Sequence, residues 1–215
     1  NLKNVKVWQK DGWRGEDLLA SVGKLSLHAN RVDIKNSIID INDITLEKPS
    51  VTIYDYKGKR PPNTNTSADK TQETEPGIGE LQWNTGGWHL SAKTISLEDG
   101  MVAVENETSV LPTPGVFDDS RIIVSAINGK LKNTRMINDT LESSVEINAK
   151  DRGGFLIKKL AADFKFTPVI MEFKHLDIIT RSSHLRDYFA MHYHHFNDDM
   201  QDFTNNVTLD GHFIN

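Results

Sequence analysis

The sequence lacks several features that mark common functional classes. It contains no cysteine, so it can form neither a disulfide framework nor a thiolate metal site. It has no run of about 18 consecutive apolar residues, the length a membrane-spanning helix needs. It also lacks a glycine-rich phosphate-binding loop and the strand–turn–helix setting of a serine nucleophile. We therefore expect a protein without catalytic residues and without a cofactor.

Composition narrows the range of partners. The 215 residues are 37% hydrophobic and 26% charged, which is typical of a globular protein. The net charge of −5 argues against nucleic acid or anionic lipid headgroups as the main partner. The chain begins at Asn1 without a methionine, so we expect it to be part of a longer protein.

Alternation of apolar and polar residues dominates the chain. Leu25, Leu27 and Ala29 alternate with polar neighbours, and similar patterns recur up to Phe213. This period of two predicts an all-β fold with a dozen or more short strands. Because strands do not alternate with long amphipathic helices, the sheet should be mostly antiparallel. Two short helices are predicted, at 16–22 and 198–205.

One segment occurs twice. ITLEKPSVTI begins at Ile44 and ISLEDGMVAV begins at Ile95, 51 residues later. In each copy an alternation is followed by turn-type residues and then by a second alternation. The pattern predicts a strand, a turn and a strand used twice, and a sheet that grows by addition. Chance similarity between two hairpins is the alternative.

A polar stretch divides the chain. Residues 57–80 contain prolines and almost no apolar side chains, so we expect a flexible loop or linker. This predicts a first β block at 1–56 and a second at 81–215 that continues the same sheet.

The apolar face of such a sheet must be covered. A second sheet would give a sandwich, and a sheet that curls around a ligand would leave a groove. The residues alone favour the sandwich.

Three groups of residues suggest chemistry, each with a plainer interpretation. His192 and His194, with Asp198, could hold zinc or nickel, but a solvated strand face is the favoured interpretation, so we expect no metal site. The acidic pairs at 118–119 and 198–199 fit turns. Four tryptophans could form a carbohydrate platform, although packing at strand ends is the more common role; they are Trp8, Trp13, Trp83 and Trp88.

Several stretches together resemble a known family. They are GEDLLASVGKLSLHAN, ITLEKPSVTIYDYKGK, WHLSAKTISLEDGMVAVENE, FDDSRIIVSAINGKLKN and RGGFLIKKLAADFKFTPVIMEFKHLDIITRSSHLRDY. They resemble the strand successions of TamB-like proteins of the AsmA-like superfamily, especially Bacteroidetes members, over most of the chain outside the polar stretch. The N-terminal membrane helix and the C-terminal barrel-contacting region of that family have no counterpart in this sequence.

The resemblance implies an elongated, curled, taco-like β-sheet with an apolar inner surface. It implies a periplasmic location in a protein anchored in the inner membrane. It further implies phospholipid transport toward the outer membrane, or assembly and secretion of outer-membrane proteins, with an outer-membrane barrel as partner through regions absent here. We expect acyl chains to contact the inward members of the alternations: Ile44, Leu46, Val51, Ile53, Ile95, Leu97, Val102, Val104, Phe164, Phe166, Met171 and Phe173. Dry core is the alternative for each of them, and a β-sandwich interaction module of the cell surface is the alternative function.

Overall fold

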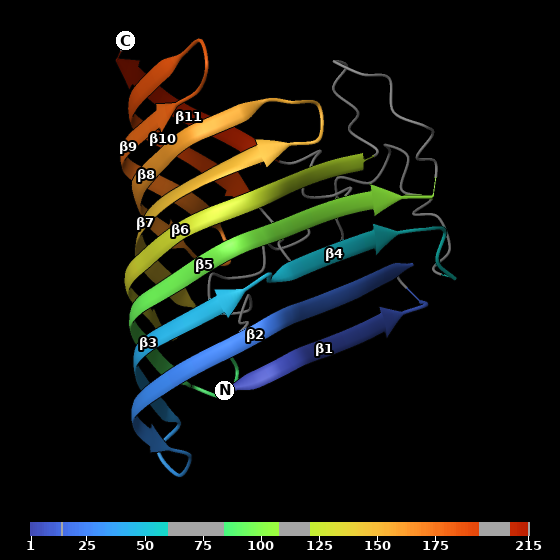
Figure 1. Ribbon diagram of the computed structural model, residues 1–215, viewed down its shortest axis with the longest axis vertical. Coiled ribbons are helices and arrows are strands. Elements are labelled where there is room, and N and C mark those ends of the chain that lie inside the picture. The colour runs from blue at the N-terminus through green and yellow to red at the C-terminus, as the bar shows by residue number, and fades with distance from the viewer. Residues whose placement is uncertain (14, 60–83, 108–120, 194–206, 215) are drawn as a thin grey trace, which may run out of the picture.

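The computed structural model describes residues 1–13, 15–59, 84–107, 121–193 and 207–214, which form eleven strands and no helix (Figure 1). The strands are β1 (Leu2–Asp11), β2 (Glu16–Asp33), β3 (Ile38–Glu47), β4 (Ser50–Asp55), β5 (His89–Asn106), β6 (Arg121–Ile137), β7 (Thr140–Asp151), β8 (Leu156–Phe166), β9 (Ile170–Ile179), β10 (His184–Tyr193) and β11 (Val207–Ile214).

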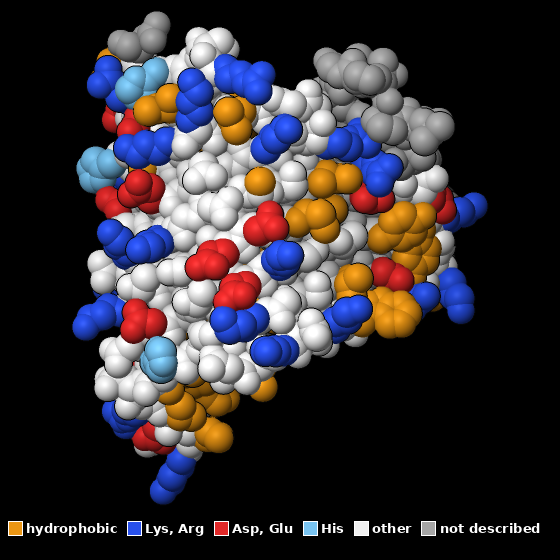
Figure 2. Space-filling view, in the orientation of Figure 1, with side chains coloured by type: hydrophobic (Ala, Val, Ile, Leu, Met, Phe, Trp, Pro, Cys, Tyr) orange, Lys and Arg blue, Asp and Glu red, His pale blue; other side chains and the backbone are white. Residues whose placement is uncertain are grey.

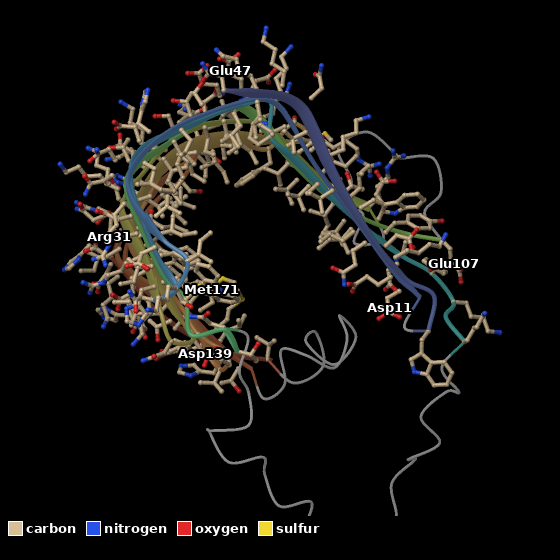
Figure 3. All side chains as sticks on the ribbon, turned by 90° about the horizontal axis from the view of Figure 1, so that it is seen from below. Asp11, Arg31, Glu47, Glu107, Asp139 and Met171 are labelled. Carbon is tan, nitrogen blue, oxygen red and sulfur yellow. The ribbon has the colours of Figure 1, made fainter. Side chains whose placement is uncertain are left out.

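All eleven strands belong to one sheet. Its order is β1-β2-β3-β5-β6-β7-β8-β9-β10-β11, and β4 pairs with β2 and β5. Neighbours are antiparallel except where β3 and β4 pair with β5. The sheet curls, so that its cross-section in Figure 3 is an open horseshoe. The predicted all-β, mostly antiparallel, curled sheet is therefore confirmed, whereas the sandwich is wrong, because the described strands form a single layer.

The repeated segment does not form two hairpins. β3 and β4 run in the same direction, because β2 pairs antiparallel with both of them. The second copy lies entirely within β5. The predicted hairpin turns are wrong, because the chain keeps its direction past Lys48 (φ 54°), between β3 and β4, and past Asp99 (φ 55°), within β5.

The two copies lie side by side in parallel register. Ile44 pairs with Ile95 and Leu46 with Leu97; beyond the interruption, Val51 pairs with Val102 and Ile53 with Val104. The backbone bond from Lys48 N to Glu98 O (2.7 Å) and that from Met101 N to Pro49 O (2.8 Å) join the two interruptions. The two copies, which are 51 residues apart in the sequence, thus occupy equivalent positions on neighbouring strands of the sheet.

A row of residues with positive φ crosses the N-terminal half of the sheet; we call it the crease. It contains Asn4, Lys48, Asp99 and Ala126. An extended strand alternates its side chains between faces, and one left-handed residue shifts that alternation by one position. The crease therefore reverses which parity faces inward.

The reversal can be followed residue by residue. Glu47 points out of the horseshoe in Figure 3, so its neighbour Leu46 points inward. Asp11 points inward, and Val7 lies four residues earlier on the same face of β1. Val7 pairs with Ala20, Ala20 with Val51 and Val51 with Val102, so these four residues share the concave face. Leu46 and Val51 differ in parity, yet both face the concave side.

Further bulges add curvature beyond the crease. Register shifts occur at Ala29–Arg31 in β2, at Lys132–Arg135 in β6 and at Ala161–Asp163 in β8. An extra residue in one strand of a pair bends that strand and increases its twist. Repetition of such bends across neighbouring strands closes the sheet into a trough.

The predicted helix at 16–22 is wrong, because these residues open the long strand β2. β1 lies on one side of them and β4 on the other, so both sets of backbone groups are paired in the sheet. The predicted helix at 198–205 lies outside the described residues, as does almost all of the predicted linker at 57–80.

Candidate functional site: an apolar trough

The concave face of the sheet is lined mainly by apolar side chains, and we call it the trough. Figure 3 shows Met171 pointing into the trough and Arg31 pointing away from it. Figure 2 shows the convex face, where Lys, Arg, Asp and Glu side chains are interspersed. Most charged side chains thus lie on the outside of the curve, together with some apolar ones, and the inside is mainly apolar.

Eight of the predicted groove residues form one patch on β3, β4 and β5. They meet in the four pairs made by the two copies of the repeat. Because the crease shifts the alternation in both strands at the same place, all eight lie on the concave face. The list is Ile44, Leu46, Val51, Ile53, Ile95, Leu97, Val102 and Val104.

The other four predicted residues form an aromatic patch on β8 and β9. Phe164 pairs with Phe173, with ring centroids 5.1 Å apart, and Phe166 pairs with Met171. The ring row continues from Phe173 to Phe189 at 6.2 Å and from Phe189 to Phe213 at 6.5 Å. Such spacings are typical of favourable aromatic pairs.

Residues that were not predicted as groove residues join the two patches. Ile95 pairs with Leu131, and Leu131 pairs with Val145. Phe189 and Phe213 extend the aromatic row to the edge strand β11. Their alternation is visible in the sequence, but which parity faces inward depends on the positive-φ residues. Asn, Asp and His favour positive φ, yet Lys48 and Ala126 also adopt it, so residue type alone does not locate these positions.

The large side chains of the trough remain partly accessible. Among the described residues, Leu176 at 3% exposed is the one large apolar side chain that is buried. The buried apolar positions are mostly alanines, including Ala92, Ala149 and Ala162. Val102, in the trough, keeps 40% of its surface exposed. A sealed core would bury such residues, so the trough presents apolar surface to whatever enters it.

One pair of polar side chains interrupts the apolar lining of the trough. Thr134 and Ser143 place their hydroxyl oxygens 2.9 Å apart, and the Ser143 hydroxyl also donates to the Lys132 carbonyl at 3.3 Å. Because these hydroxyls bond to each other and to the backbone, they add little polarity to the face.

Ion pairs tie the outer side of the C-terminal strands. Lys159 of β8 and His184 of β10 both contact Asp177 of β9, with atoms 2.8 Å and 2.6 Å apart. The Lys159 ammonium, followed by His184, lowers the pKa of the Asp177 carboxyl. The imidazole of His175 and the Ser144 hydroxyl likewise lower the pKa of Asp163. These contacts lie across strands, so they fix register rather than create a reactive site.

The candidate metal residues are not brought together in the described structure. His192 lies exposed near the end of β10, and His194 and Asp198 fall outside the described residues. No group of three or more His, Asp or Glu side chains suited to a metal ion occurs in the part of the chain that is described. That part also contains no helix that could cross a membrane.

Two of the four tryptophans can be placed on the surface. Trp8 on β1 and Trp13 after it are 68% and 60% exposed, and Lys10 lies over the Trp8 ring at 5.7 Å. They are therefore not core residues.

Comparison of the chain with family models, with curated proteins and with solved structures gave no match in any of the three.

Proposed function

We propose that the trough is a passive conduit for the acyl chains of phospholipids, in a TamB-like protein of the periplasm that is anchored in the inner membrane. Acyl chains would lie along the concave face while headgroups stay in water at the open side of the horseshoe. No residue performs a chemical step. Transport toward the outer membrane, or assistance to outer-membrane protein assembly, is the role that fits such a conduit.

The physical basis is the cost of exposing hydrocarbon to water. Each CH₂ group transferred from an apolar environment into water costs about 0.8 kcal/mol. A continuous apolar surface removes most of that cost at every point along the path, so a chain can slide without a large barrier. The observation that carries the proposal is that a mainly apolar face lies on the concave side of the sheet and is not covered by a second sheet of described strands.

Two neighbouring residues provide a matched test. Val102 and Met101 are adjacent in β5, are 40% and 37% exposed, and point to opposite faces. Val102→Glu places a charge in the trough, whereas Met101→Glu places the same charge on the convex face. We expect Val102→Glu to weaken binding of a fluorescent long-chain fatty acid at least about tenfold, because the bound chain would have to displace water from the carboxylate. Met101→Glu should bind like the unmodified protein.

The fatty-acid binding of each variant is interpreted together with its folding. Both variants should keep the β-sheet circular dichroism spectrum, because both positions are partly exposed. Equal binding by the two variants, or absence of co-purified lipid in native mass spectra together with no fatty-acid binding, would refute the conduit.

A second candidate function rests on the sheet edges. β1 pairs only with β2, and β11 only with β10, within the described strands. Trp8 and Leu209 on these edges are 68% and 62% exposed. Such edges favour β-augmentation by a client strand. A proline scan of β1 would abolish client binding in this case and leave fatty-acid binding intact.

A further inference from the structure

A basic depression lies on the convex face, on the opposite side of the sheet from the trough. It has a volume of about 410 Å³ between β6, β7 and β8. Its polar lining consists of Lys130, Lys132, Glu146, Asn148, Lys158 and Lys159. Four ammonium groups in one hollow stand out in a protein whose net charge is −5.

A bulge in β8 brings two of the lysines to the same side. Ile147 pairs with Leu160 and Ala149 pairs with Ile157, so β8 carries one more residue than β7 between these two pairs. Consecutive residues of a regular strand point to opposite faces, but at a bulge two neighbours can share one face. Lys158 and Lys159 accordingly both line the depression.

Glycine forms part of the floor. Gly129 lines the depression with φ at 150°, and a Cβ built there would lie 2.1 Å from the Glu146 carbonyl oxygen. No other residue fits at this point without moving β7. The close approach of the two backbones leaves the hollow open between the lysine side chains of β6 and β8.

The charges do not cancel. Lys159 is paired with Asp177 at 2.8 Å. Lys130, Lys132 and Lys158 make no ion pair within the described residues, and Glu146 is the one carboxylate in the lining. Three unpaired ammonium groups around one carboxylate leave a positive field in the hollow, to which a dianion can bind with several charge-assisted hydrogen bonds.

We propose that this depression is an oxyanion site for a phosphate group, with Lys130, Lys132 and Lys158 as ligands and Asn148 as a further donor. The phosphate is either free or carried by the headgroup of a bilayer lipid that the convex face meets. The proposal is independent of the trough, which lies on the other face and binds hydrocarbon.

The experiment titrates inorganic phosphate into the intact chain and follows the backbone amide resonances of Gly129 and Asn148. We expect saturable shifts. Lys130→Gln, Lys132→Gln and Lys158→Gln should each raise the dissociation constant about three- to tenfold. Glu146→Gln should lower it by a similar factor, because it removes the carboxylate that repels phosphate. Lys6→Gln, which makes the same change in net charge on distant β1, is the control and should change it less than about 1.5-fold.

Binding to lipid vesicles distinguishes a lipid headgroup from free phosphate as the source of the phosphate group. Co-sedimentation with phosphatidylglycerol vesicles but not with phosphatidylcholine vesicles, lost in Lys132→Gln, identifies a bilayer headgroup. Phosphate binding without vesicle binding identifies a free phosphate. An equal effect of Lys6→Gln and of the three lining variants, no saturation, or no gain in Glu146→Gln would each overturn the site.

Discussion

Residues with positive φ govern the shape of this sheet. Asn4, Lys48, Asp99 and Ala126 take left-handed conformations. Asn and Asp adopt them readily, whereas for Lys48 and Ala126 the cost is about 1–2 kcal/mol each. Their row allows alternations of opposite parity to share one face. The conformation of Lys48 and Ala126 therefore costs stability locally, while the row as a whole places apolar side chains of both parities on the concave face.

Ala126 offers a direct test of this cost. It has φ of 50° and is exposed. We expect Ala126→Gly to raise the free energy of unfolding by about 1 kcal/mol, because glycine adopts this conformation without a steric penalty. Ala126→Val should lower it by about 1 kcal/mol or more, since a β-branched residue fits the left-handed region poorly. Urea denaturation of the three proteins measures both changes. Equal stability of the Gly and Val variants would show that the crease is not strained there.

Strand pairs are held by cross-strand contacts on the outside and by apolar rows on the inside. The N-terminal pairs use lysine and arginine, as in Lys24 with Glu47 and Arg135 with Glu142. The pairs from β8 onward add histidine, as in His175 with Asp163 and His212 with Asp187. Exposed pairs of this kind contribute little to stability individually, so their main effect is on register.

The Asp177 contacts predict a pH dependence of stability. Lys159 and His184 lower the pKa of Asp177 below its usual value of 3.8 in the folded protein. A depressed carboxyl pKa stabilises the fold at neutral pH, and that contribution is lost as the pH falls through the folded-state pKa. Asp177→Asn should therefore have a lower melting temperature at pH 7, with a loss of less than about 1 kcal/mol in the free energy of unfolding. The difference from the unmodified protein should disappear as the pH falls through the folded-state pKa of Asp177.

The matched control for this pH dependence is Asp43→Asn. Asp43 is exposed on β3 and makes no ion pair within the described ranges. Its replacement should leave the melting temperature unchanged at pH 7 and in acid. A gap between Asp177→Asn and the unmodified protein that persists in acid would contradict the assignment.

At the scale of the molecule, the open trough makes stability depend on what fills it. A ligand that binds only the folded state adds RT ln(1 + [L]/Kd), which is about 2.7 kcal/mol at 100 times Kd. We expect a long-chain fatty acid to raise the melting temperature and a short one such as butyrate to have no effect, because binding scales with the apolar area covered. Differential scanning calorimetry measures the shift. The effect should vanish in Val102→Glu and persist in Met101→Glu; a shift of the same size with butyrate would exclude the trough as its cause.

The sequence predicts the fold class, but it does not predict which face of each strand lies on the concave side. Alternation with period two is a property of neighbouring residues, so the strand class and the repeat that begins at Ile44 and Ile95 are visible without coordinates. The pairing of the two copies in parallel register is not. The interruptions at Lys48 and Asp99 resemble turns in the sequence, because the same residue types favour hairpin turns and left-handed bulges. Only the pairing with neighbouring strands decides whether the chain reverses in a hairpin turn or continues past a left-handed residue.

The sequence by itself determined that the chain is all-β and that its apolar residues recur at every second position. The tertiary structure alone decided that the strands form one curled layer, that the crease unites both parities on the concave side, and that lysines distant in sequence gather on the convex side. The physical reason is that side-chain periodicity is local, whereas curvature and register arise from the backbone bonds between strands that lie far apart in the chain.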